Sequence, residues 1–364
     1  MELLYQLALT LVPNIGDVQA KILVQQLGSA STVFEERLSA LEKIEGIGTV
    51  RARSIREFNS FHLAEEEIKF IERFGIKTLF LTDKDYPQRL LNCYDSPTLL
   101  FFKGPANLNV PKIISIVGTR SQTEYGKQFT EKLVKDLSEQ QILIVSGLAF
   151  GIDAQAHKAA LKNNLPTVGV VGHGLDTIYP YPHASLAREM IEEGGGLLSE
   201  FFSGTKPDKH HFPLRNRIVA GLADATVVVE TNIKGGSMIT AKLADAYNRD
   251  VFAVPGRTVD KTSSGCNHLI KFNKAILLTD AEQLLEVMGW KDKRKELRQQ
   301  RELFIELSTE EQQIVQLLQE KESIHIDELN LKSGLSSSAV AAAILNLEIQ
   351  NVIVSQPGKM YKLL

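Results

Sequence analysis

The sequence predicts an α/β protein in which helices cover both faces of a mostly parallel sheet. From Pro111 onward, short runs rich in Ile, Leu and Val alternate with amphipathic stretches of helical period, the pattern of strands joined by crossover helices. Most of these runs end in glycine or in polar residues. The first and last sixty residues lack this alternation. We therefore expect a Rossmann-like sheet with a helical N-terminal domain and a C-terminal winged-helix domain.

Four parts are expected along the chain of 364 residues. A helical domain of the SAM-like or helix-hairpin-helix type is predicted over residues 1–62. The extended Rossmann-like domain is predicted over 63–290. Residues 291–307 are rich in charged side chains and are interpreted as a linker. The winged-helix domain is predicted over 308–364.

A degenerate repeat marks the N-terminal part. Residues 12–16 lead into a helical stretch that contains Ala20, and residues 44–48 lead into another that contains Ala52 at the same spacing. One interpretation is a pair of helix-hairpin-helix units whose helix N-termini offer backbone N–H groups to phosphate. The alternative is a small helical bundle whose glycines only permit the turns. Only two arginines lie near the second hairpin, so both interpretations stay open.

Nine segments are candidate strands. They are Ile76–Leu81, Thr98–Phe102, Ile113–Val117, Ile142–Val145, Thr167–Val171, Leu197–Ser199, Thr226–Glu230, Val251–Val254 and Ala275–Leu278. In open parallel sheets ligands bind beyond the carboxyl ends of the strands. The glycines and polar residues that follow these strands therefore predict a binding site at that edge of the sheet. The spatial order of the strands cannot be read from the sequence.

The last part shows the layout of a winged helix. A helix, a short helix, a turn at Gly334 and a further helix are followed by a hairpin around Pro357 and Gly358. The candidate recognition helix, Ser336–Gln350, contains neither Lys nor Arg. A helix without cations cannot neutralise phosphates, so we favour a protein-interaction or regulatory role for this domain.

Composition excludes several classes of protein. The hydrophobic content is 43%, the charged content is 23% and the net charge is −3, so the chain is of ordinary globular type and any polyanion site must be a local patch. No apolar run is long enough to span a membrane and no signal peptide is seen, so a cytoplasmic protein is expected. Cys93 and Cys266 are far apart, which argues against a disulfide or a thiolate metal site. No metal or cofactor is predicted.

Residues 118–126 contain the first candidate site. Gly118 ends a strand and lets a ligand approach the backbone, and Arg120 follows Thr119 with a planar fork of donors suited to phosphate. Ser121 and Glu124 fit a capping box for the next helix.

A second glycine-rich segment follows the next strand. Ser146 and Gly147 are candidates to offer a hydroxyl and an amide to phosphate. Asp153 is expected to cap the following helix, and His157 on that helix is expected to be structural, because a single imidazole without a nucleophile or a second ligand has no catalytic role.

The densest basic cluster spans residues 206–217. Lys209, Arg215 and Arg217 are the predicted phosphate contacts, and Phe212 is the predicted stacking platform for a base, since single-stranded nucleic acid is bound by cations along its backbone and rings against its bases. The alternative is that Phe212 is part of the core and that the arginines cap a helix.

The last candidate site is the start of a helix at residues 235–242. Gly235, Gly236 and Ser237 are predicted to form an anion site of backbone amides and a hydroxyl. Lys242 lies in the second turn of that helix and is a candidate to reach the same anion; a solvated surface lysine is the alternative.

Four motifs occur in one order within the sheet domain: Gly118-Thr-Arg with Tyr125-Gly126, Ser146-Gly-Leu-Ala-Phe-Gly-Ile-Asp with Ala156-His157, Phe212-Pro-Leu-Arg-Asn-Arg-Ile, and Gly235-Gly-Ser. Together they resemble the DprA/Smf family over about Ile76 to Val287. The resemblance implies a homodimer that binds single-stranded DNA in a basic pocket of the sheet and loads the RecA recombinase during natural transformation.

The same resemblance implies which residues matter. Positions on the DNA-contact motifs are Gly118, Thr119, Arg120, Ser146, Gly147, Lys209, Phe212, Arg215, Asn216, Arg217, Gly235, Gly236, Ser237 and Lys242. His268, Leu269 and Leu277 fall near the family's dimer surface.

Enzyme interpretations fit the motifs less well, and no catalytic residues are predicted. Residues 172–177 imitate a dinucleotide-binding loop but lack its third glycine, and residues 256–262 imitate a P-loop with Asp260 in place of a glycine. A nucleotide phosphoribohydrolase, or another nucleotide-binding Rossmann enzyme, is the main alternative. Its signature glutamate is absent from residues 234–242, where Lys242 stands, so we expect binding without turnover.

Overall fold

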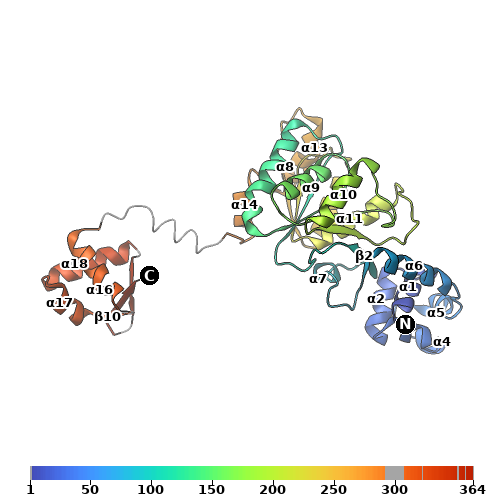
Figure 1. The fold of residues 1–364 in the computed structure, drawn as a ribbon, viewed down its shortest axis with the longest axis horizontal. Coiled ribbons are helices and arrows are strands. Elements are labelled where there is room, and N and C mark those ends of the chain that lie inside the picture. Colours follow the sequence, from blue (N-terminus) through green and yellow to red (C-terminus); the bar gives the residue numbers. More distant parts are fainter. Residues whose placement is uncertain (1, 292–306, 322, 351, 357, 364) are drawn as a thin grey trace. The chain divides into compact units, whose positions relative to one another are not determined.

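The computed structural model describes residues 2–291, 307–321, 323–350, 352–356 and 358–363. The chain forms two compact units, Met1–Met288 and Gly289–Leu364, and each is described by itself (Figure 1). Most of the predicted linker, residues 291–307, lies outside the described residues. No helix in the part of the chain that the structure describes is long and apolar enough to cross a membrane.

Six helices begin the first unit. They are α1 (Glu2–Leu11), α2 (Asp17–Leu27), α3 (Ala30–Glu35), α4 (Leu38–Leu41), α5 (Gly48–Arg56) and α6 (Phe61–Phe74). Their hydrophobic core is continuous with that of the sheet. The predicted boundary at residues 62 and 63 falls inside α6, because the amphipathic pattern of that helix begins at Phe61.

The two turns of the N-terminal repeat are tied to each other. Arg51 donates one hydrogen bond to the backbone oxygen of Asn14 in the first turn (3.1 Å) and one to that of Gly46 in the second (3.1 Å). Gly46 and Gly48 have positive φ angles, 83° and 64°, which residues other than glycine rarely adopt. The internal use of Arg51 favours the interpretation in which the repeat is a packed helical bundle.

Nine strands form one sheet in the order β1-β2-β6-β5-β4-β3-β7-β8-β9. Their bounds are β1 Lys77–Phe80, β2 Leu99–Lys103, β3 Ile113–Val117, β4 Leu143–Ser146, β5 Thr167–Val170, β6 Gly196–Ser199, β7 Ala225–Val228, β8 Asp250–Ala253 and β9 Ile276–Leu277. Neighbours from β6 through β9 pair in parallel, and β1 and β2 pair antiparallel at one edge. The α/β, mostly parallel fold predicted from the sequence is confirmed.

The strand order reverses between β3 and β7. From β3 the chain moves outward through β4, β5 and β6, and it then returns to the other side of β3 and moves outward through β7, β8 and β9. Right-handed crossovers on the two sides of such a point place their helices on opposite faces of the sheet. The adjacent loops separate there, and ligands bind in the crevice that results.

Helices cover the sheet on both faces. The larger ones are α8 (Glu124–Asp136), α9 (Ile152–Lys162), α10 (Ala184–Glu192), α11 (His211–Leu222), α12 (Ser237–Ala246) and α13 (Ser264–Lys271). Two shorter helices are α7 (Gln88–Leu91) and α14 (Ala281–Val287). Helix α8 packs against α9 and α14, whereas α11 packs against α12 and α7. The central strands are accordingly buried along their whole length.

The second unit is a winged helix with its own core. It contains α16 (Thr309–Gln319), β10 (Ile324–His325), α17 (Ile326–Ser333), α18 (Ser337–Ile349), β11 (Ile353–Gln356) and β12 (Met360–Leu363). Its three strands pair in the order β10-β12-β11. The predicted turn residue Gly334 has a φ of 68° after α17. Helix α18 occupies most of the predicted recognition helix, and Ser336 caps it.

Candidate functional site

A pocket of about 700 Å³ opens where the strand order reverses. We call it the switch-point pocket. It is lined by the loops that follow β3, β4 and β7 and by the starts of α11 and α12. Most of the predicted DNA-contact residues line it: Gly118, Thr119, Arg120, Gly147, Lys209, Phe212, Arg215, Asn216, Gly235, Gly236 and Ser237. Segments far apart in the sequence therefore meet at one hollow, because the carboxyl ends of parallel strands lie at the same edge.

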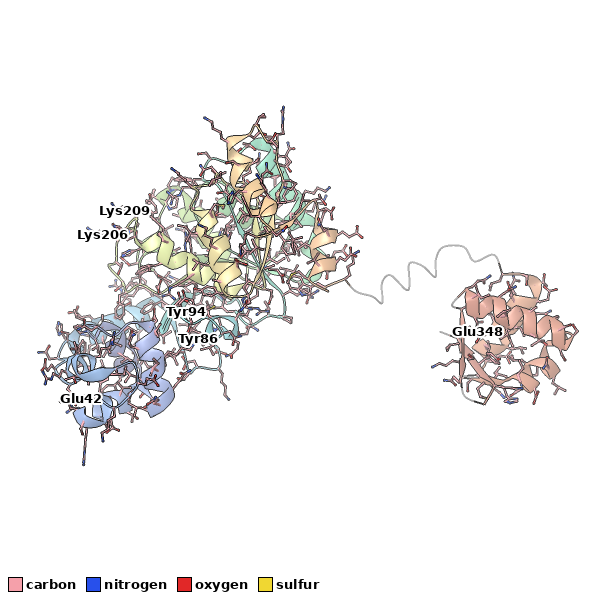
Figure 2. All side chains as sticks on the ribbon, turned by 180° about the vertical axis from the view of Figure 1, so that it is seen from behind. Glu42, Tyr86, Tyr94, Lys206, Lys209 and Glu348 are labelled. Carbon is pink, nitrogen blue, oxygen red and sulfur yellow. The ribbon has the colours of Figure 1, made fainter. Side chains whose placement is uncertain are left out.

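The mouth of the pocket combines a cation with an aromatic ring. The exposed guanidinium of Arg120 lies 5.5 Å from the centroid of the Phe212 ring, within the range of a cation–π contact. The Tyr179 ring lies 5.8 Å from the same centroid. Phe212 is half-buried, which favours the stacking interpretation over the one in which it is a core residue. Lys209 is exposed on the loop before α11 (Figure 2).

The start of α12 forms one wall of the pocket. The Ser237 hydroxyl lines the pocket, is buried and has no hydrogen-bond partner among the described residues. Gly236 before it has an ordinary φ of −61°, and a side chain there would meet no atom within 4 Å. Gly235 has no such space, because a Cβ would collide with the Thr231 hydroxyl. A helix N-terminus with an unpaired hydroxyl and open space beside it suits phosphate.

The floor of the pocket contains two buried residues of opposite charge, Arg215 and Asp153. Arg215 is buried and donates to the backbone oxygens of Gly147 and Val170. Gly147 follows β4, and Val170 is the last residue of β5. Asp153 accepts from the backbone N–H groups of Gly147 (3.2 Å) and Ala149 (3.4 Å). Burial raises the pKa of Asp153 against the opposing effect of Arg215, and burial lowers the pKa of Arg215 to about 10. These two residues hold the strand ends together.

Three predictions about the segment after β4 need correction. Ser146 is buried, does not line the pocket, and its hydroxyl donates to the backbone oxygen of Ile116 (2.5 Å). The Gly147 amide is used by Asp153. Asp153 does not cap its helix, because α9 already begins at Ile152 after Gly151. The structural role of His157 is consistent with its geometry: the buried ring contacts the Thr167 hydroxyl (2.6 Å), and burial lowers the pKa of His157 to about 3.

The predicted capping box at Ser121 and Glu124 is also wrong. Thr123 caps α8, and its hydroxyl accepts from the backbone N–H of Gly126 (3.3 Å). Both the N–H and the hydroxyl of Thr123 donate to the buried carboxylate of Glu230, at 2.9 and 2.5 Å. Glu230 follows β7, so it fixes the loop after β3 across the switch point. A side chain at Gly126 would collide with this carboxylate.

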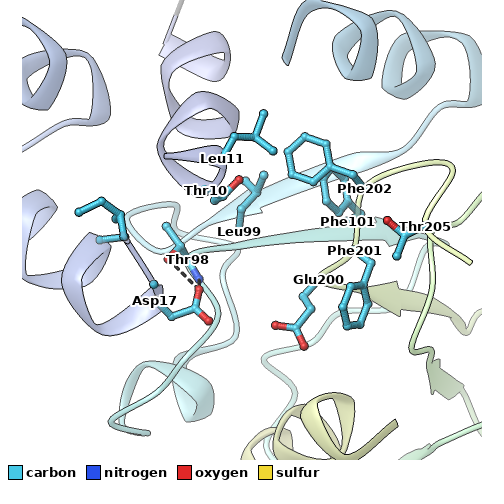
Figure 3. Close-up of a pocket in the computed structure, with 13 residues that line it drawn as sticks. Thr10, Leu11, Asp17, Thr98, Leu99, Phe101, Glu200, Phe201, Phe202 and Thr205 are labelled. Atoms are coloured by element: carbon cyan, nitrogen blue, oxygen red, sulfur yellow. Dashed lines mark hydrogen bonds between the residues drawn. The ribbon is translucent and has the colours of Figure 1, made fainter. Parts of the chain in front are cut away.

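Arg217, a predicted phosphate contact, does not line the pocket, and its guanidinium is already paired. It is 8% exposed and forms ion pairs with Glu200 and with Asp17 of α2 (2.9 Å). We call these three residues the Arg217 cluster. Positions two apart on a helix point in different directions, so Arg215 and Arg217 reach opposite surroundings. Burial raises the pKa of Glu200 to about 7. Asp17 and Glu200 line a separate cavity of about 370 Å³. Figure 3 shows these two residues and the hydrogen bond from the Thr98 N–H to Asp17.

Lys242 and the predicted dimer residues lie elsewhere. Lys242 is exposed on α12 but does not line the pocket. Leu277 is exposed on β9 at the edge of the sheet, and His268 is half-buried with its ring 4.6 Å from that of Phe272. Leu269 is buried in the core, so it is not a surface residue of this unit. Its helix turns that side chain toward the sheet.

Tyr179 and Asn232 are among the pocket-lining residues that were not predicted as ligand contacts. Tyr179 lies in the loop after β5, in a run of alternating aromatic residues and prolines that was available as a signal. Asn232 directly precedes the segment considered for α12. Among the described residues there is no group of three or more His, Cys, Asp or Glu side chains placed to hold a metal ion.

Comparison with known proteins gives a consistent family. Residues 77–289 match the family model described as DNA recombination-mediator protein A, and residues 303–359 match the DprA winged helix domain. Protein Smf of Synechocystis sp. is 32% identical over 98% of this chain and 98% of its own length. DNA processing protein DprA of Streptococcus pneumoniae is 41% identical over 63% of this chain and 78% of its own.

Two solved structures share the fold and a substantial part of the sequence. The X-ray structure of DprA from Streptococcus pneumoniae matches with a TM-score of 0.64 and 35% identity, over 78% of this chain and 95% of that one. DprA from Helicobacter pylori, whose structure is described as giving insight into its single-stranded DNA binding mode, matches with a TM-score of 0.54 and 31% identity, over 59% and 96%. The chain therefore belongs to the DprA/Smf family of DNA-processing proteins.

Proposed function

We propose that this protein binds single-stranded DNA in the switch-point pocket and does not chemically change it. The observation that carries the proposal is the meeting of Arg120, the Phe212 ring and the unpartnered Ser237 hydroxyl in one hollow. Single-stranded nucleic acid is bound by cations and amides along its phosphates together with rings that stack on its bases. The description of the Helicobacter pylori relative as a single-stranded DNA binder supports the same ligand.

Each part of the pocket has a role in this binding. One phosphate lies at the start of α12, against the Ser237 hydroxyl and beside Gly236, where the absent side chain allows close approach. Arg120 and Lys209 neutralise neighbouring phosphates and release counterions. A base stacks on Phe212.

The floor keeps this arrangement rigid without taking part in a reaction. The Arg215 guanidinium and the Asp153 carboxylate are already satisfied by backbone groups and by each other's charge, so Asp153 is not a free general base toward a bound ligand.

We further propose that two copies associate through the sheet edge at β9 and that the complex loads the RecA recombinase. Ile276 and Leu277 are exposed on this edge strand, and Phe272 is exposed beside it. Unpaired edge strands with apolar side chains are favourable surfaces for association. Leu277→Asp is expected to shift a dimer to monomer in light scattering, and RecA filament formation on coated single-stranded DNA tests the loading. A Leu277→Asp variant that stays dimeric would contradict the proposed surface.

The DNA-binding proposal is tested by titrating a fluorescent oligonucleotide at several salt concentrations. Arg120→Ala is expected to reduce the slope of log K against log salt by about one. Lys242→Ala is the matched control, because it removes the same charge from an exposed position outside the pocket. Gly236→Asp is expected to abolish binding without unfolding the protein, since the added side chain has open space but places a negative charge at the phosphate position. Wild-type affinity in Gly236→Asp would exclude the proposed phosphate site.

A further inference from the structure

Three large aromatic side chains are exposed on the two loops that also carry the pocket-lining residues Ala149 and Tyr179. Phe150 is 47% exposed, Tyr179 is 46% exposed and Tyr181 is 83% exposed. They come from the loops that follow β4 and β5. Exposed aromatic residues that cluster at the edge of a binding pocket indicate an interaction surface. We call these three residues the aromatic rim.

The rim is continuous with the pocket. Tyr179 lines the pocket, and its ring is 5.8 Å from the Phe212 centroid with an angle of 31° between the ring planes. Ala149, which precedes Phe150, also lines the pocket. A chain of bases that leaves Phe212 therefore meets Tyr179 first.

A buried histidine joins the two loops that carry the rim. The His183 ring lies 4.9 Å from the Phe150 ring, edge to face, and its Nδ1 is hydrogen-bonded to the backbone oxygen of Leu148 (2.9 Å). His183 also ends the segment Tyr181–His183 that begins with the exposed tyrosine. The loop of Tyr179 and Tyr181 is thus held against the loop of Phe150.

We propose that the aromatic rim is a second base-stacking subsite, which takes the unpaired bases that follow the nucleotide held on Phe212. This inference rests on the proposed function, because its occupant is the strand bound in the pocket. Every base has a π face, so stacking on these rings requires no particular sequence. The site size of the protein then extends beyond the nucleotides that the pocket itself encloses.

The test is a length series of fluorescent oligothymidylates, from about 3 to about 15 nucleotides. Tyr181→Ala is the informative variant, because a side chain that is 83% exposed contributes little to folding. It is expected to weaken binding of the long oligonucleotides by about 5- to 150-fold, the effect of losing one stacked base, and to leave the shortest ones unchanged. Tyr181→Phe keeps the ring and is expected to bind as the wild type does.

A matched control and a second readout separate stacking from a general loss of surface. Tyr94 is 67% exposed after α7 and lies outside the pocket lining (Figure 2), so Tyr94→Ala is expected to bind normally. An oligonucleotide with 2-aminopurine at successive positions reports stacking by quenched fluorescence. The wild type is expected to quench at positions over Phe212 and over the rim, and Tyr181→Ala is expected to lose quenching at the one position that stacks on Tyr181 and to keep it over Phe212.

The outcomes distinguish the two proposals. If Arg120→Ala weakens every oligonucleotide while Tyr181→Ala binds all lengths as the wild type does, the pocket stands and the rim subsite is excluded. An equal loss at all lengths in Tyr181→Ala also overturns the second subsite, because the ring would then act on the first nucleotide. If the wild type binds no single-stranded DNA at any length, the proposed function itself fails.

Discussion

The switch-point pocket and the Arg217 cluster both contain an arginine, Arg120 in the loop after β3 and Arg217 on α11, and use it in opposite ways. At the pocket, Arg120 is exposed against a ring and has no salt bridge among the described residues. In the cluster, Arg217 is buried between two carboxylates. Arg215, two residues before it, is buried but directs its donors to backbone oxygens. The difference teaches that a basic motif does not specify which of its cations remain available to a ligand.

The largest effect that tests this comparison is expected at Arg217. Arg217→Ala leaves Glu200 and Asp17 without their shared counterion, and breaking a buried pair in this way costs about 3–5 kcal/mol. The free energy of unfolding is measured by urea titration, and DNA affinity is measured under conditions where the variant is folded. We expect affinity to be unchanged. Arg120→Ala is the reciprocal control, because it is expected to retain stability and to reduce DNA affinity. A reduced slope of log K against log salt in folded Arg217→Ala would show that Arg217 also contacts phosphate and would contradict the contrast between the two regions.

A pH titration sharpens the account of the cluster. Burial raises the pKa of Glu200 from 4.5 to about 7. Between these values the folded state keeps a proton that the unfolded state has released, so its contribution to stability is present below about pH 4.5 and is lost as the pH rises through about 7. The size of this contribution is about 3 kcal/mol.

Glu200→Gln is the variant that isolates this group. The urea midpoint of the variant is expected to change less with pH between about 4.5 and 7 than that of the wild type. Some dependence remains, because burial also raises the pKa of Asp153 and of Glu67. A wild-type midpoint that rises with pH across this range would contradict the assignment to Glu200.

On the pocket side, Phe212→Ala is expected to cost about 1–3 kcal/mol of binding free energy through the lost base stacking. The same change removes the partner of the Arg120 guanidinium. Fluorescence titration gives the affinity and thermal unfolding gives the stability. If the variant loses thermal stability while its folded molecules keep the wild-type affinity, the Phe212 ring stabilises the fold as Arg217 does. The pocket would then not differ from the Arg217 cluster in this respect.

The smallest effect is expected from removal of the winged helix. Truncation after Trp290 deletes α18, which has neither Lys nor Arg and so neutralises no phosphate. The first unit retains its own continuous core. Titration of the truncated protein is expected to reproduce the affinity and the salt slope of the full chain. A clear loss of affinity would place part of the DNA site in the second unit.

Local pattern by itself determined the positions of the strands and most of the pocket. Ile113–Val117 was predicted with the bounds that the structure gives, because a short apolar run followed by glycine is a strand signal independent of its neighbours. The convergence of Gly118, Phe212 and Gly235 followed from the rule that ligands bind at the carboxyl ends of parallel strands.

Only the tertiary structure decided which polar groups were free. The partner of Arg217 on α2 is 200 residues away, and the partner of Thr123 after β7 is 107 residues away. Such pairs depend on the order of the strands and the placement of the helices, and the hydrophobic periodicity of a single segment does not specify either. For the same reason Tyr179 joined the pocket and Lys242 did not: proximity to a ligand is a property of the folded surface, whereas helix and strand periods are properties of neighbouring residues.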